Sequence, residues 1–195
     1  KGVDVIDGGG GIDEVRYSGD YAANGDKFGV AVNLSSAKVT EPLSGWNYAL
    51  AAGTALDGWG TIDALNNIEN ARGSIYADAI FGSSANNTLS GDEGNDLLVG
   101  GGGNDSLDGG RGNDVVWLPG ASATEWTFAR DATTPAQVHA TKGTQSDLLI
   151  GVESVRFADD ASATHYSLAG LLGEPVGAAM TMNFAGAPVD PVVSG

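Results

Sequence analysis

The sequence predicts an all-β solenoid of stacked parallel strands, on three observations. Residues 73–117 divide without slippage into five consecutive nine-residue units: GSIYADAIF, GSSANNTLS, GDEGNDLLV, GGGGNDSLD and GGRGNDVVW. The eighth residue of every unit is aliphatic, and the sixth is Asp or Asn. A strict short period is typical of identical units that bury their apolar faces only by stacking on one another.

Each unit is expected to form one turn and one short strand. In the last three residues of a unit the middle side chain points inward and its neighbours point outward. The Gly-rich hexad before the strand is then the turn, where residues without a Cβ permit positive φ and let the backbone fold closely around an ion. The predicted inward residues are Ile80, Leu89, Leu98, Leu107 and Val116.

The spacing also predicts two rows of polar side chains. If nine residues cross one side of the solenoid and eighteen complete a circuit, Asp78, Asp96 and Asp114 lie on one edge, and Asn87 and Asp105 on the other. At about 4.8 Å between rungs and an effective dielectric of about 20, two such carboxylates repel by roughly 3 kcal/mol. A cation between them removes this repulsion. Oxygen ligands with no His or Cys nearby indicate a hard cation, and a flexible site suits calcium better than magnesium.

Composition supports a metal-dependent protein. The chain of 195 residues has 25 acidic and 9 basic residues, a net charge of −16, which argues against nucleic acid or an anionic membrane as partner. It has no cysteine, so disulfides and zinc–thiolate sites are excluded. Neither a cleavable N-terminal signal nor an apolar run of about 18 residues is present. We expect metal to supply the missing stabilisation, and residues 73–117 to be largely disordered without calcium.

These residues resemble the RTX (repeats-in-toxin) family of calcium-binding, hemolysin-type nonapeptide repeat proteins, whose consensus is G-G-x-G-x-D-x-U-x. Units 100–108 and 109–117 match every fixed position, and unit 91–99 differs at Asp92. The two units before them carry Ser, Tyr or Ala at the inner glycine positions. Calcium affinity is therefore expected to fall toward the N-terminal end of this block. Residues 1–16 carry a second, shorter match, so we expect the chain to begin inside a repeat and Lys1 not to be the natural start.

The predicted fold is an all-β, right-handed parallel β-roll (RTX solenoid) with an N-terminal sheet extension and a C-terminal β cap. Within the extension, Phe28–Leu34 reads as a strand, and Ile62–Ala71 as either a strand pair or the first rung. The predicted divisions are partial RTX repeats at 1–16, a β extension entering the roll at 17–72, the nonapeptide β-roll at 73–117, the C-terminal β cap at 118–168, and a tail at 169–195 that is a linker or a secretion-signal segment.

The resemblance implies several calcium ions, held between rungs by carboxylates and by main-chain groups of the turns. The candidate metal-site residues are Asp4, Gly8, Gly9, Gly11, Asp13, Asp78, Asn87, Gly91, Glu93, Gly94, Asp96, Gly100, Gly102, Gly103, Asp105, Gly109, Arg111, Gly112 and Asp114.

The resemblance further implies a secreted, extracellular or cell-surface bacterial protein that leaves the cell through type I secretion machinery and folds outside, where calcium is abundant. Two alternatives stay open: a carbohydrate or cell-surface binding module, and part of an enzyme whose catalytic domain lies upstream. No catalytic activity is expected of this chain, because His139 and His165 have no nucleophile motif beside them. The candidates for a sugar platform, for which packing is the stronger interpretation, are Trp46, Trp59, Trp117 and Trp126. Trp117 lies in the last unit, so we expect it to cover the end of the solenoid.

Overall fold

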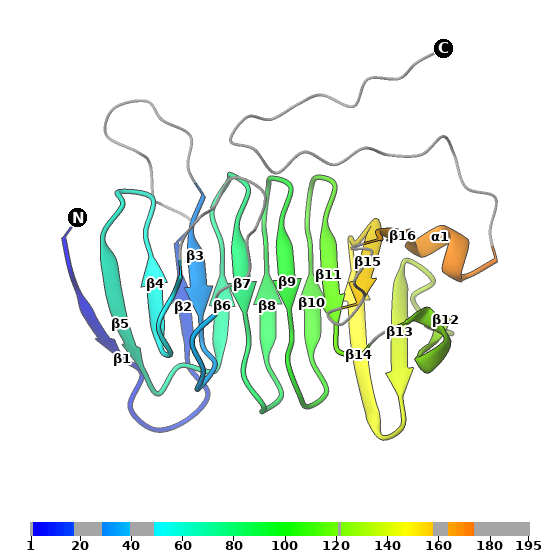
Figure 1. Cartoon of the computed structure of the whole chain (residues 1–195), viewed down its shortest axis with the longest axis horizontal. Coiled ribbons are helices and arrows are strands. Elements are labelled where there is room, and N and C mark those ends of the chain that lie inside the picture. The colour runs from blue at the N-terminus through cyan, green and yellow to red at the C-terminus, as the bar shows by residue number, and fades with distance from the viewer. Residues whose placement is uncertain (1, 18–28, 40–48, 121, 158–163, 174–195) are drawn as a thin grey trace, which may run out of the picture.

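The structure is a computed structural model, and it describes residues 2–17, 29–39, 49–120, 122–157 and 164–173 (Figure 1). This part of the chain is all-β with almost no helix, because short apolar strands alternate with Gly-rich turns. Its elements are β1 (Val5–Asp7), β2 (Glu14–Arg16), β3 (Ala31–Asn33), β4 (Thr54–Leu56), β5 (Ile62–Asn66), β6 (Asn70–Arg72), β7 (Ala79–Phe81), β8 (Thr88–Ser90), β9 (Leu97–Val99), β10 (Ser106–Asp108), β11 (Val115–Leu118), the 3₁₀ turn η1 (Ala123–Glu125), β12 (Thr127–Arg130), β13 (Gln137–Lys142), β14 (Gln145–Ile150), β15 (Ser154–Phe157), β16 (Tyr166–Ser167) and α1 (Leu168–Leu171).

The strands form two mixed sheets, and consecutive strands of the repeat block alternate between them. The nine-stranded sheet has the order β1-β5-β4-β3-β7-β9-β11-β15-β16, and the seven-stranded sheet has the order β12-β13-β14-β10-β8-β6-β2. Ala79 pairs with Leu97, and Leu97 pairs with Val115, in parallel register. Each step is eighteen residues, so the predicted spacing between rungs is confirmed.

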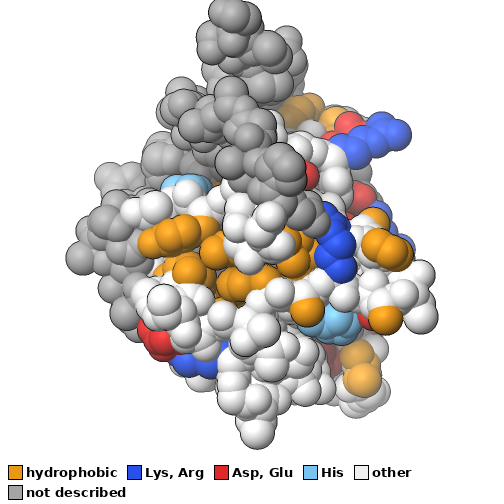
Figure 2. Space-filling view, turned by 90° about the vertical axis from the view of Figure 1, so that its right-hand side faces the viewer, with side chains coloured by type: hydrophobic (Ala, Val, Ile, Leu, Met, Phe, Trp, Pro, Cys, Tyr) orange, Lys and Arg blue, Asp and Glu red, His pale blue; other side chains and the backbone are white. Residues whose placement is uncertain are grey.

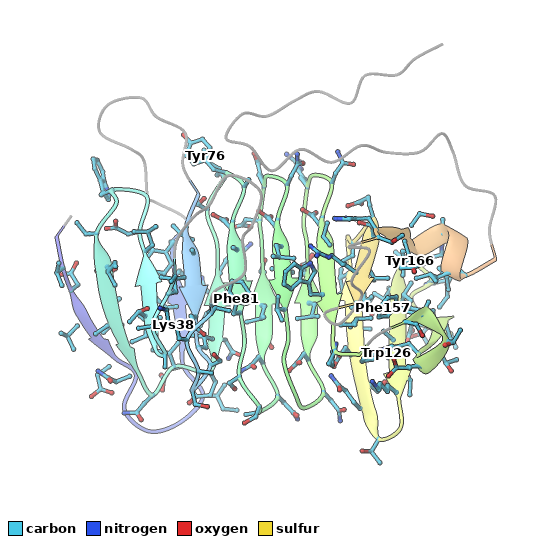
Figure 3. The ribbon with its side chains drawn as sticks, in the orientation of Figure 1. Lys38, Tyr76, Phe81, Trp126, Phe157 and Tyr166 are labelled. Atoms are coloured by element: carbon cyan, nitrogen blue, oxygen red, sulfur yellow. The ribbon has the colours of Figure 1, made fainter. Side chains whose placement is uncertain are left out.

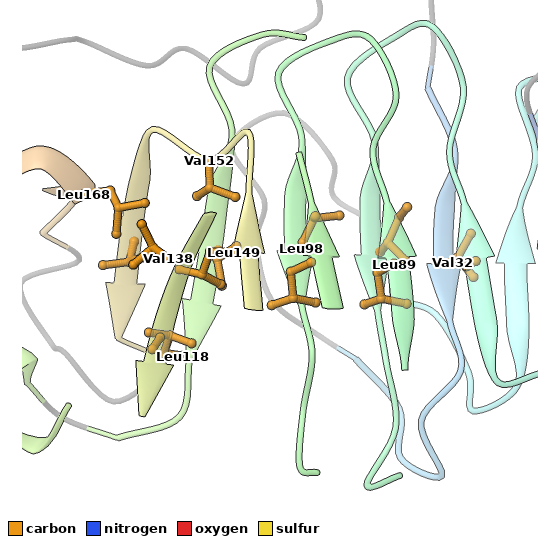
Figure 4. Packing of buried hydrophobic residues seen from close by; sticks show 14 of the residues in the cluster. Val32, Leu89, Leu98, Leu118, Val138, Leu149, Val152 and Leu168 are labelled. Atoms are coloured by element: carbon orange, nitrogen blue, oxygen red, sulfur yellow. The ribbon is translucent and has the colours of Figure 1, made fainter. Parts of the chain in front are cut away.

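The core lies between the two sheets and is built from the eighth residue of each unit (Figure 4). These five side chains have no measurable exposure, which confirms the predicted inward positions. Residues from both flanks continue the same cluster, including Val32 on the N-terminal side and Leu149 on the C-terminal side. The inward residues are Ile80, Leu89, Leu98, Leu107 and Val116.

Truncation of one inward residue is expected to leave a cavity between the sheets. Leu98→Ala should lower the free energy of unfolding in saturating calcium by about 2–5 kcal/mol, because the main chain on either side cannot collapse into the gap. Thr88→Ala is the matched control, since Thr88 is exposed on β8 and its loss should cost about 0.5 kcal/mol or less. Urea denaturation of both variants measures the difference, and equal losses would contradict this description of the core.

The outward positions of the repeats differ between the two sheets, which the nine-residue period does not reveal. In the seven-stranded sheet they are polar, as in Thr88 and Ser106. In the nine-stranded sheet they are apolar and form a second buried cluster, with Val39 packed against it. The members of this cluster are Ala31, Leu50, Leu56, Ala79, Phe81, Leu97, Val115 and Trp117.

Trp117 belongs to this outer cluster, and the expectation that it covers the end of the solenoid is wrong. Its strand, β11, is followed in the sheet by β15, so it is not the last rung. As the ninth residue of its unit, Trp117 points away from the core, is 6% exposed and lies 4.6 Å beneath the guanidinium of Arg156.

Both flanks of the repeat block extend the two sheets. The predicted strand at 28–34 contains β3, which pairs with β7 in parallel. Ile62–Ala71 contains β5 and the start of β6, which lie in different sheets and do not pair with each other. Beyond the repeats, β12 to β14 extend the seven-stranded sheet, and β15 and β16 extend the nine-stranded one.

Seen from the C-terminal end of the stack, hydrophobic side chains gather near the middle of the exposed face (Figure 2). Trp126 belongs to the core cluster there, and its indole N–H donates to the carbonyl of Pro119 at 3.0 Å. Phe157 and Tyr166 stack edge to face with their ring centroids 5.4 Å apart (Figure 3). No helix in the described ranges is long and apolar enough to cross a membrane. Trp46 and the tail from residue 174 lie outside the described residues.

Candidate metal centre

One edge of the stack carries a ladder of aspartates, as the spacing predicts. The main-chain N–H of Asp78 donates to Oδ1 of Asp96 at 2.8 Å, and the N–H of Asp96 donates to Oδ1 of Asp114 at 2.8 Å. Successive carboxylates therefore do not face each other directly, because a main-chain N–H binds one oxygen of each. This arrangement gives one oxygen of each carboxylate a donor and leaves Oδ2 for another partner.

The second edge repeats this pattern, and both ladders end on residues outside the repeats. The N–H of Asn87 donates to Oδ1 of Asp105 at 2.8 Å, and the N–H of Asp105 donates to Oδ1 of Asp147 at 3.1 Å. On the first edge, the N–H of Asp114 donates to Oε2 of Glu153 at 2.8 Å. Asp147 and Glu153 thus take the place of the sixth residue of a further unit.

Sequence reasoning missed these two residues, although a signal was present. The stretch Asp147-Leu148-Leu149 repeats Asp96-Leu97-Leu98, and Glu153 likewise stands two residues before an aliphatic, Val155. Neither stretch follows a consensus Gly-rich turn, so the nine-residue period does not reach them. The register confirms the equivalence, since Leu149 pairs with Leu107 and Val155 pairs with Val116.

The free oxygens of the ladder are buried and have no hydrogen-bond donor. Oδ2 of Asp96, Asp105 and Asp114 lacks any partner among the described residues, and so does Oδ2 of Asp13. Asp96 and Asp114 are completely buried, and Asp105 is 3% exposed. A buried ionised oxygen without a partner costs several kcal/mol, which a bound cation would offset.

The first glycine of each unit makes room for these oxygens. A Cβ on Gly91 would lie 2.0 Å from Oδ2 of Asp96 and 2.7 Å from the carbonyl oxygen of Gly109. The positive φ expected of the turn glycines is found at the second and fourth positions, for example at Gly110 (φ +96°) and Gly103 (φ +99°). The first glycine has no positive φ and is needed for space alone.

Burial raises the pKa of the ladder carboxyls. Desolvation is the main cause throughout, and it raises the pKa of Asp78 to about 7, of Asp105 to about 6 and of Asp114 to about 7. The pKa of Asp96 is raised well above its ordinary value by desolvation and then by repulsion from Asp78 and Asp114. The ladder therefore resists ionisation unless positive charge is supplied.

Two N-terminal candidates, Asp4 and Asp13, make the same kind of contact between a main-chain N–H and a carboxylate, each with one partner. The N–H of Asp4 donates to Oδ1 of Asp63 at 3.0 Å, and the N–H of Asp13 donates to Oε2 of Glu69 at 2.9 Å. Asp63 and Glu69 were not predicted, because neither follows a turn with the nonapeptide consensus and both lie far along the chain from their partners.

Glu93 and Arg111 do not join the ladder. Their side chains are exposed and pair with each other at 3.4 Å. Nowhere in the described ranges do three His, Cys, Asp or Glu residues group in a way that could hold an ion. A metal site here therefore requires main-chain carbonyls beside the ladder aspartates. The donor set fits a hard cation such as calcium. The glycines that would supply carbonyls remain predicted ligands: Gly8, Gly9, Gly11, Gly91, Gly94, Gly100, Gly102, Gly103, Gly109 and Gly112.

Comparison with known families agrees with this geometry. Residues 1–15 and 72–116 match the RTX calcium-binding nonapeptide repeat in four copies. A comparison with curated proteins gave no match. The matched segments contain the turns that carry the free oxygens of Asp13, Asp96, Asp105 and Asp114. These two segments are therefore RTX calcium-binding nonapeptide repeats.

Proposed function

We propose that this chain is a calcium-binding module whose folding is triggered by extracellular calcium, and that its two-sheet stack is a right-handed parallel β-roll. The observation that carries the proposal is the set of buried carboxylate oxygens without a donor at Asp96, Asp105 and Asp114. In the absence of a cation, these oxygens oppose the packing that buries them. In its presence, the same oxygens hold neighbouring turns together.

The module serves type I secretion and stabilisation of a secreted bacterial protein. Extracellular calcium modules bind at about 10⁻⁴–10⁻³ M, well above cytosolic calcium, so the chain stays open inside the cell and folds outside. Each site that fills stabilises the folded state by RT ln(1 + [L]/Kd), and several sites filling together make the transition steep. The net charge of −16 supports this role, because it opposes compaction until cations bind. The chain itself is proposed to be non-catalytic.

Calcium titration by isothermal calorimetry tests the proposal. Asp96→Asn should bind at least one ion fewer than the natural chain, because it removes the charge of the central ladder residue while keeping its shape. Asp108→Asn is the matched control, since Asp108 lies on β10 outside the ladder and should leave the number of ions unchanged. Absence of calcium binding by the natural chain at about 1 mM, or a midpoint near cytosolic calcium, would overturn the proposed function.

The described tryptophans do not favour the carbohydrate-binding alternative. Trp117 and Trp126 are each 6% exposed and pack within the protein, so neither offers a free ring face to a sugar. Trp59 is half-buried beside a turn. Within the described residues, Trp117 and Trp126 therefore give no support to the carbohydrate-binding alternative.

A further inference from the structure

Resting on the proposed function, we propose that the turns are of two kinds. Four take calcium, at 8–13, 91–96, 100–105 and 109–114. Two are closed without it, at 73–78 and 82–87, because a serine at the second position of each satisfies the polar group that would otherwise hold the ion. Asp78 and Asn87, both predicted as metal-site residues, are then structural residues of closed turns.

In the closed turns the sixth residue is fully hydrogen-bonded, by the serine of its own turn and by a main-chain group from another segment. Ser74 donates its main-chain N–H to Oδ2 of Asp78 at 2.5 Å and its hydroxyl to Oδ1 at 2.9 Å. The N–H of Val30 donates to the same Oδ1 at 2.6 Å. An N–H and an O–H directed at one carboxylate present partial positive charge to both of its oxygens, where the other ladder aspartates leave one oxygen unpartnered. Asp78 accordingly has no unpartnered oxygen, although it is only 3% exposed.

The next turn is closed in the same way. Ser83 donates its N–H to Oδ1 of Asn87 at 2.7 Å and its hydroxyl to the same atom at 3.3 Å. The amide Nδ2 of Asn87 donates to the carbonyl of Glu69 at 2.5 Å. Asn87 therefore has no free acceptor facing the interior of the turn, and its side chain brings no charge that a cation would neutralise.

The serine hydroxyls also fix the shape of these turns. Each accepts the N–H of the residue two positions later, Tyr76 in one turn and Ala85 in the other, at 3.1 Å in both. Tyr76 is seen at the turn end of the stack in Figure 3. The residues at the second and fourth positions of these two turns are Ser74, Tyr76, Ser83 and Ala85. None of them has positive φ, so side chains are tolerated there.

The four calcium turns share the opposite features. Their second and fourth residues all have φ between +80° and +155°, and in each the Oδ2 of the sixth residue is unpartnered. The left-handed second residue no longer directs its N–H at the carboxylate, which leaves that oxygen free. Asp92 is the one non-glycine among these residues, with φ +81°. Arg72 holds it there through bonds of 2.7 and 2.5 Å to its two carboxylate oxygens, so Arg72 is a positioning residue for the turn at 91–96.

Native mass spectrometry of the full chain in saturating calcium counts the ions and tests this assignment. Ser74→Gly with Tyr76→Gly converts the first turn to GGIGAD and should add one ion. Gly110→Ser with Gly112→Ala imposes the closed pattern on 109–114 and should remove one. Asp78→Asn, a nearly isosteric change that does not depend on remodelling a turn, should leave the count as it is in the natural chain, whereas Asp114→Asn should lower it.

The ion counts distinguish a failure of the two-turn assignment from a failure of the proposed calcium-binding function. A natural chain without bound calcium overturns the proposed function. If the natural chain binds calcium but Asp78→Asn binds one ion fewer, the assignment of two kinds of turn is wrong and the proposed function still holds. The same conclusion follows if Ser74→Gly/Tyr76→Gly binds as many ions as the natural chain. Should either double variant fail to fold, the ion counts of Asp78→Asn and Asp114→Asn still test whether the turns at 73–78 and 109–114 differ in calcium binding.

Discussion

Removal of calcium with EDTA is expected to abolish most of the β-sheet signal of residues 73–117, with the largest loss at β9, β10 and β11. These strands follow the three turns whose buried carboxylate oxygens have no donor. Each unpaired oxygen costs about 1–3 kcal/mol or more as a charged group. Three of them approach the total stability of about 5–15 kcal/mol that is typical of a domain.

Far-UV circular dichroism and amide hydrogen exchange, each with calcium and with EDTA, measure this loss. Exchange should quicken least at β7 and β8, which follow the two closed turns, and magnesium at the same concentration should restore less structure than calcium. A β spectrum and slow exchange that persist in EDTA would show that the ladder does not depend on a cation.

In EDTA, acidification from about pH 8 to about pH 5 is expected to stabilise the fold. Burial raises the folded-state pKa of Asp78 and Asp114 to about 7 and of Asp105 to about 6, against an ordinary value of 3.8. The folded chain therefore binds more protons than the unfolded chain between these values. The stability that these groups contribute is fully present below the unfolded pKa and is lost as the pH rises through about 6–7.

Calcium reverses this dependence, because a carboxyl must lose its proton before it binds the ion. Urea denaturation at steps between pH 5 and pH 8 should show stability falling with pH in EDTA and rising with pH in calcium. Asp114→Asn should flatten the slope in EDTA, since one of the groups that titrate is gone, whereas Asp108→Asn should flatten it less. An apo protein that gains stability with rising pH would show that these carboxyls are ionised and paired without metal.

Much of the repeat block can be predicted from residue spacing alone. The aliphatic at every eighth position identifies the core strands, and the eighteen-residue step assigns Asp78, Asp96 and Asp114 to one edge. Both depend on local geometry, because every unit repeats the same turn and the same strand. The Ser for Gly replacements at positions 74 and 83 are also visible in the sequence, but their effect is not. It depends on whether the serine N–H points toward the sixth residue, and only the backbone conformation of the turn decides that.

The residues that complete the ends of the two ladders could not be predicted from the sequence, for a different reason. Asp147 and Glu153 reach the ladder through strands that follow an irregular connection and a hairpin, so no period relates them to Asp105 and Asp114. The apolar outer face of the nine-stranded sheet was missed because the outward residues change character from one nine-residue unit to the next and repeat only every eighteen residues.

By itself the sequence determined that this chain stacks short strands, buries one aliphatic per unit and presents a row of carboxylates on each edge, since these properties repeat wherever the nine-residue pattern repeats. The tertiary structure alone decided which carboxylate oxygens lack a donor, which residues complete each ladder and which outer face is apolar. These depend on contacts between segments far apart in the chain and on the direction of single N–H groups, neither of which a local pattern specifies.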